Sequence, residues 1–172
     1  MADYSDEFFD ISAFHMSVWA VSAKKQLERV RDNSQSGELR FIDFVFLIIS
    51  LRNYELAFKR HRDELWGTVG RGKGSVYRRR AAKWADQALE IFEERLPDLR
   101  DMRNIFSHLE EYAYGEGRKQ ISGTPLSVLS GGTSVFTIKS EDFIFTIDLD
   151  EVATALTDIE ECTIQLFTWW TP

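Results

Sequence analysis

The chain has 172 residues, of which 44% are hydrophobic, 28% charged and 13% aromatic, and its formal net charge is −7. This length predicts a single domain over residues 1–172 that buries roughly 70% of its unfolded surface. The single cysteine, Cys162, excludes an internal disulfide framework and indicates the reducing cytoplasm. The acidic balance argues against general affinity for nucleic acid. The longest apolar run, 41–51, is shorter than the ~20 residues of a membrane span, so no membrane partner is expected.

Apolar residues at helical spacing predict a first helix over residues 11–32. The side chains expected to face the core are Phe14, Val18 and Val21. His15 lies beside them and is expected to be partly buried as a packing residue. A polar turn at 33–37 ends this element.

A long second helix is predicted over residues 38–66. Its first half is apolar nearly all round, which predicts the central and most buried element of the fold. Its second half is highly charged, and His61, within that charged run, is expected at the surface.

The glycine-rich segment 67–75 resembles the front of a phosphate-binding loop, because Gly67 is followed after four residues by Gly72 and Lys73. Gly74, however, occupies the position of the Ser or Thr that binds magnesium. The segment also follows a predicted helix, whereas a phosphate-binding loop follows a strand. We therefore interpret it as a linker.

A third helix is predicted over residues 76–96, with Ser75 as its N-cap. Cations gather at its start, where the helix dipole disfavours them by ~0.3–1 kcal/mol each. No acidic residue occurs between residues 65 and 85. Two interpretations stay open, a solvated helix start or a phosphate-facing patch that binds RNA. The cations of this cluster are Arg71, Lys73, Arg78, Arg79, Arg80 and Lys83.

A fourth helix is predicted within residues 97–115, with Pro97 in its first turn and Gly115 just past its end. Its apolar residues share one face, and they are Leu99, Met102, Phe106, Leu109 and Ala113. At roughly 100° per residue, the opposite face carries Arg103, Asn104, Ser107 and His108. This polar cluster is therefore expected to face water, a ligand or a second chain.

The remaining chain predicts a β-hairpin, with strands at 134–138 and 143–147, and a last helix over 149–167. The expected fold is mainly α, a four- to five-helix up-and-down bundle with a small hairpin before the last helix. We find no convincing set of metal ligands and expect no cofactor.

Residues 99–111, LRDMRNIFSHLEE, resemble the signature of the HEPN superfamily, an Arg, a polar residue, three variable residues and a His. The resemblance implies a small helical domain that cleaves RNA without a metal, with Arg103, Asn104 and His108 as catalytic residues. It implies a homodimer in which two motifs meet at the two-fold axis. It also implies that the protein acts as a toxin or in defence. Its implied partners are RNA and an antitoxin or other regulatory protein.

The residue types suit this chemistry. An imidazole accepts or donates a proton near neutral pH, and a guanidinium matches a phosphate. On a continuous helix Arg103 and His108 lie roughly 140° apart, so one copy does not easily bring both side chains into contact with the same phosphate. A second copy related by a two-fold axis can supply the missing group.

The sequence leaves alternatives open. Glu110 occupies the position of the tyrosine found in HEPN toxins paired with nucleotidyltransferase antitoxins, which puts that subgroup in doubt. Arg103 can instead pair locally with Asp98, Asp101 or Glu110. The chain can also be a non-catalytic HEPN-like module that dimerises and binds a nucleotide or protein, or a helical scaffold that docks another protein.

Overall fold

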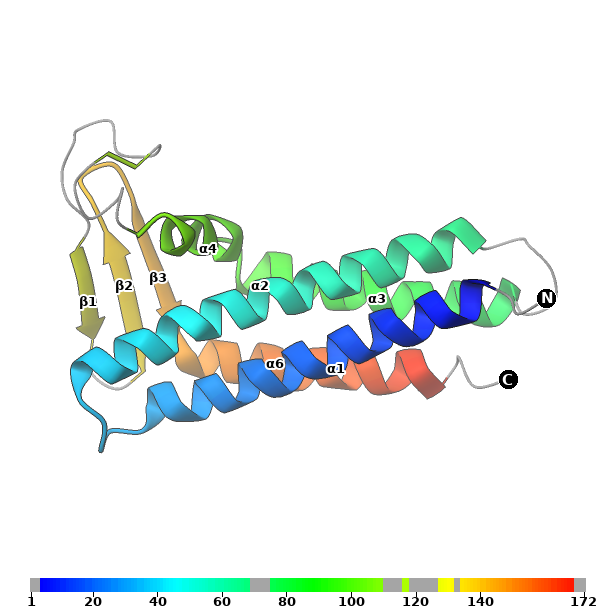
Figure 1. Ribbon diagram of the computed structural model, residues 1–172, viewed down its shortest axis with the longest axis horizontal. Coiled ribbons are helices and arrows are strands. Elements are labelled where there is room, and N and C mark those ends of the chain that lie inside the picture. Colours follow the sequence, from blue (N-terminus) through cyan, green and yellow to red (C-terminus); the bar gives the residue numbers. More distant parts are fainter. Residues whose placement is uncertain (1–3, 69–74, 110–115, 118–126, 132–133, 169–172) are drawn as a thin grey trace.

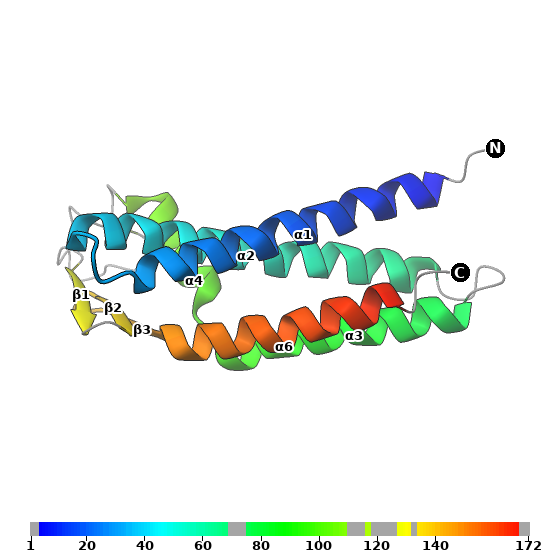
Figure 2. The same cartoon turned by 90° about the horizontal axis from the view of Figure 1, so that it is seen from below.

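The computed structural model describes residues 4–68, 75–109, 116–117, 127–131 and 134–168. The body of the fold consists of the long helices α1 (Tyr4–Arg31), α2 (Gly37–Thr68), α3 (Ser75–Arg95) and α6 (Leu149–Thr168). They alternate in direction along the chain and lie in two layers, α1 with α2 and α3 with α6 (Figures 1 and 2). The predicted mainly α, up-and-down bundle is confirmed.

A small antiparallel sheet lies at the end of the bundle where α1 joins α2 (Figure 1). Its strands are β1 (Ser127–Gly131), β2 (Val135–Lys139) and β3 (Ile144–Asp148), in that order. The predicted hairpin is confirmed as β2 and β3, whereas β1 was not predicted. The hairpin alternates in burial and turns Phe136, Ile138, Phe145 and Ile147 toward the core.

The buried apolar side chains form one cluster, and α2 supplies the largest share of its big members. Phe44, Leu47, Ile48, Leu51 and Phe58 are all 0% exposed. The prediction that the second helix is the central element is therefore confirmed. Among the described helices, none combines the length and the apolarity needed to cross a membrane.

The predicted inward face of the first helix is wrong. Phe14, Val18 and Val21 are 65%, 42% and 53% exposed. The side chains of α1 that are buried are Met16, Ala23, Leu27 and Val30. Helix α1 carries apolar residues on two nearly opposite faces, and the face with the smaller side chains packs against the core.

Both histidines predicted outside the motif are also placed differently. His15 is exposed, although its ring lies 6.3 Å from that of Phe14. His61 is 0% exposed, and its ring lies 6.3 Å from that of Phe167 on α6. Burial lowers the pKa of His61 from 6.5 to about 4, because the interior disfavours the charged imidazolium.

Candidate functional site

The motif lies on α4 (Leu99–Ser107), a short helix that follows α3 after the turn at Pro97. Its inner face is formed by the buried residues Leu99, Met102, Ile105 and Phe106. The ring of Phe106 meets those of Phe41 and Phe44 edge-on, at centroid distances of 6.1 and 5.9 Å. These contacts hold α4 against the first half of α2.

The fourth helix is shorter than predicted. It begins after Asp98, because Leu99 N–H donates to the carbonyl of Leu96 (3.1 Å) in a turn through Pro97. It ends at Ser107, and His108 is the C-cap residue with φ −127° and ψ 37°. The predicted residues beyond Leu109, up to Gly115, lie outside the described residues. The 140° separation expected for a continuous helix therefore does not apply to His108.

The predicted outward orientation of the motif is confirmed. Arg103, Asn104, Ser107 and His108 are all exposed. Arg103 Nη1 donates to Asn104 Oδ1 (3.4 Å), and Ser107 Oγ donates to the carbonyl of Arg103 (2.9 Å). The amide of Asn104 thus orients the guanidinium, whose other N–H groups include the donors that suit a phosphate.

Arg103 does not form the predicted local ion pairs with the acidic residues of α4 and its N-cap. Within the described part of the chain, Arg103 forms no ion pair with Asp98 or Asp101. Glu110, the third partner considered, lies outside the described residues. Arg103 is therefore held by a neutral amide on its own helix.

The described part of the predicted RNA-binding cluster lies far from the motif. Arg71 and Lys73 fall outside the described residues, whereas Arg78, Arg79, Arg80 and Lys83 lie in the first half of α3. Lys83 precedes the end of α3 by twelve residues, a rise of about 18 Å. Figure 1 shows the start of α3 at the opposite end of the bundle from α4. One copy of the chain therefore does not bring these four cations and the motif together.

Other cations lie much closer to α4, in a groove of about 360 Å³ between α2, α3 and the start of α4. The basic side chains that line it are Arg52, Lys59, Arg62 and Arg100, and Glu55 and Glu93 also line it. Arg52 pairs with Glu55, and Arg62 pairs with Asp63 at 2.8 Å and with Asp86 at 3.6 Å. Arg100 precedes Arg103 by nearly one helical turn. This groove could not be predicted from the sequence, because its cations come from separate segments and form no run.

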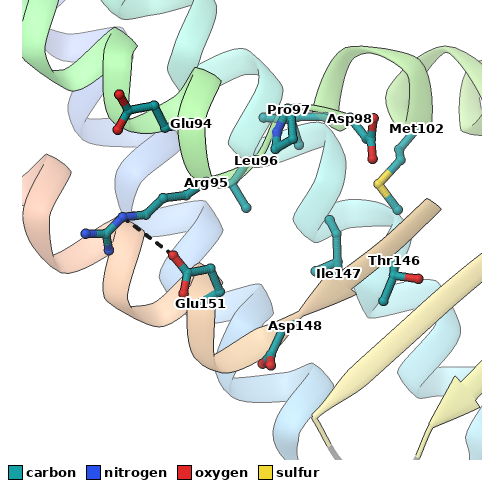
Figure 3. A pocket seen from close by; sticks show the side chains of 11 residues that line it. Glu94, Arg95, Leu96, Pro97, Asp98, Met102, Thr146, Ile147, Asp148 and Glu151 are labelled. Atoms are coloured by element: carbon teal, nitrogen blue, oxygen red, sulfur yellow. Dashed lines mark ion pairs between the residues drawn. The ribbon is translucent and has the colours of Figure 1, made fainter.

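A second pocket, of about 340 Å³, lies between the start of α4, β3 and the start of α6 (Figure 3). Its rim carries the acids Glu94, Asp98, Asp148 and Glu151, and Arg95 pairs with Glu151 at 3.5 Å. Met102 and Ile147 lie at its apolar base. This acidic rim repels phosphates, so the pocket does not suit a nucleic acid.

In the part of the chain that the structure describes, no group of three or more His, Cys, Asp or Glu side chains is arranged to hold a metal ion. Comparison of the chain with protein-family models, with curated proteins and with solved structures finds no match in any of the three. The fold and the site thus define a helical bundle that exposes an Arg–Asn–His motif at the end of a short helix. The HEPN resemblance stays a prediction that depends on this motif.

Proposed function

We propose that the protein is a HEPN-like endoribonuclease that acts as a homodimer in the cytoplasm, without a metal, as a toxin or defence protein. The observation that supports this most strongly is the joint exposure of Arg103 and Asn104 on α4 and of His108 at its C-cap. The opposite face of α4 is buried, so the motif is held on a fixed element.

The chemistry we propose is attack of the ribose 2′-oxygen on the adjacent phosphorus. The new P–O2′ bond forms as the P–O5′ bond breaks, which gives a 2′,3′-cyclic phosphate and a free 5′-hydroxyl. His108 takes the 2′ proton or donates a proton to the leaving 5′-oxygen. Arg103 binds the charge that develops on the phosphate oxygens, and Asn104 orients the Arg103 side chain. DNA lacks the nucleophile and would not react.

In this proposal the RNA strand reaches the motif from the groove between α2 and α3, along Lys59 and Arg100. Arg100 lies both in that groove and next to the motif on α4, so it connects the two. In the proposed homodimer a second copy brings its own motif to the same phosphate. An antitoxin or other regulatory protein would act by covering this surface.

The test is cleavage of single-stranded and structured RNA in EDTA by the wild type, Arg103→Ala and His108→Ala. We expect each substitution to reduce cleavage at least ~100-fold, the usual size of a lost acid–base or charge-stabilising group. Arg60→Ala and His15→Ala are matched controls, because both residues are exposed and lie on other helices. If the wild type does not cleave RNA, or if all variants cleave it equally, the proposal that the protein is a ribonuclease is refuted.

Mixing the two inactive variants tests the composite site. If one chain supplies Arg103 and the other His108, a mixed dimer keeps one intact set and cleavage partly returns. If both groups act from one chain, the mixture stays inactive. A stable dimer that binds nucleotide or protein without cleaving RNA would instead support the non-catalytic module.

A further inference from the structure

The small sheet ends in a strand edge that is open in the described part of the chain. Its strand order is β1-β2-β3, so β3 pairs with β2 on one side, and no described strand pairs with its outer edge. Native proteins usually protect such an edge with a proline, a lysine or a bulge. Strand β3, of sequence IFTID, contains neither residue and pairs with β2 in a regular register. Its outer edge is therefore a template for an additional strand.

The register identifies the backbone groups that this edge offers. Leu149 N–H donates to the carbonyl of Ser134 (2.7 Å), so this pair is hydrogen-bonded. Bonded and non-bonded pairs alternate along an antiparallel ladder, so Ile147 and Phe145 also bond to β2. The N–H and the carbonyl of Thr146 lie between them and point away from β2. Within the described residues, neither group has another backbone partner.

The outer edge of β3 borders the second pocket described above, of about 340 Å³, which we call the β3 cleft. Figure 1 shows α4 beyond β3 on the side away from β2, and Figure 3 shows the turn through Pro97 across the cleft from β3. Met102 and Ile147, at its apolar base, are 0% and 5% exposed. Sites for small ligands have volumes of roughly 300–1,000 Å³, so this cleft suits a short stretch of extended chain.

The charge of the β3 cleft determines which chain it suits. Among the described residues that line it, the one cation is Arg95, which pairs with Glu151 at 3.5 Å and with Asp158, outside the cleft, at 2.8 Å. Negative charge therefore exceeds positive charge at the rim, which attracts a cationic partner and repels an acidic one. The acids that line the cleft are Glu94, Asp98, Asp148 and Glu151.

We propose that the β3 cleft binds an extended, basic peptide segment of a partner protein, which adds to the sheet as a strand beside β3. The backbone of the segment pairs with the N–H and the carbonyl of Thr146. Side chains alternate along a strand, so the segment places apolar side chains over Met102 and Ile147 and Lys or Arg between them. The partner is thereby held beside α4, the helix that carries the motif. The inference concerns a surface other than the motif and does not require RNA cleavage.

The first test is fluorescence anisotropy with a labelled peptide of about seven alternating lysine and valine residues, the length of an ordinary strand. We expect the full chain to bind it saturably, with a Kd well below ~1 mM. Glu94→Lys should weaken binding about fivefold, the size of a lost surface ion pair. Glu93→Lys is the matched control, because Glu93 is equally exposed and adjacent on α3 but lines the groove between α2 and α3. We expect it to bind nearly as tightly as the wild type.

The second test is whether the backbones pair. The peptide should slow deuterium exchange of the Thr146 amide, whereas the Phe145 amide, which already bonds to β2, should not change. The same peptide N-methylated at alternate residues keeps its charge but loses the donors of one edge. We expect it to bind about 10-fold more weakly, because two backbone hydrogen bonds or more are lost.

Circular dichroism checks that Glu94→Lys and Glu93→Lys keep the helical content of the wild type. The inference is overturned if the peptide does not bind by ~1 mM. It is also overturned if both variants bind as the wild type does, because general attraction by the acidic chain then explains the binding. Unchanged exchange at Thr146, or equal binding of the N-methylated peptide, overturns strand addition. If the peptide binds as expected but the protein cleaves no RNA, the inference is supported and only the ribonuclease is refuted.

Discussion

Replacing His61 with phenylalanine is expected to flatten the dependence of the unfolding free energy on acid pH. Burial lowers the pKa of His61 from 6.5 to about 4 in the folded chain. Above pH 6.5 the imidazole is neutral in both states. Between pH 6.5 and 4 the unfolded chain binds a proton that the folded chain does not, so stability falls as the pH falls. A difference of 2.5 pKa units corresponds to about 3 kcal/mol lost by pH 4.

The assay is urea denaturation at pH values from 8 to 4, for the wild type and His61→Phe. Phenylalanine keeps an aromatic ring beside Phe167 and removes the titrating group. His15→Phe is the matched control, because His15 is exposed and its loss should leave the pH curve unchanged. Carboxylates contribute equally to all three proteins. Parallel pH curves for the wild type and His61→Phe would refute this reasoning.

Two further predictions concern the core. Phe44→Ala should lower the unfolding free energy by about 3–5 kcal/mol in chemical denaturation, because Phe44 is fully buried, stacks on Phe136 at 4.4 Å and meets Phe106; a loss under 1 kcal/mol would contradict this packing. Burial raises the pKa of Cys162 from 9.0 to about 11, so at pH 7.5 its thiol should react with a disulfide reagent about 100-fold more slowly than an exposed cysteine. Denaturant should abolish that protection, and fast reaction in the native protein would show that the thiol is accessible.

Much of the fold could be predicted because long helices and the hairpin have clear periods in the sequence. The apolar first half of α2 was confirmed, as were Leu99, Met102 and Phe106 on the buried face of α4. The strand β1 was missed because its residues, SVLSG, are mostly small and polar and show no strand alternation. It is a strand because β2 offers it an edge to pair with.

The wrong face of α1 has a different physical cause. Hydrophobic spacing shows that a stripe must be covered, but it does not show by what. Phe14 and Val18 form such a stripe, yet the core of this chain packs against the smaller side chains of the opposite face. An apolar stripe that is clear in the sequence but exposed in the fold indicates an interface with another molecule.

His61 was misplaced because its neighbours in sequence are charged. It follows Phe58 by three residues and precedes Leu65 by four, so the helical period alone places it on the buried face. The charged residues around it predict the surface, whereas this period predicts the core. For the motif, the exposure of Arg103 and Asn104 followed from the period of α4, whereas the end of the helix before His108 could not be read from it.

The brevity of α4 has a consequence for how the protein responds to heat. A helix of nine residues is below the ~12–15 residues that hold together alone in water, so its order depends on Phe106 being seated against α2. Its backbone amides should therefore exchange with deuterium through local opening, at a lower free energy than those of α2. Warming would then melt the segment that carries Arg103 while the four long helices remain folded, and the proposed RNA cleavage would be lost before the molecule denatures.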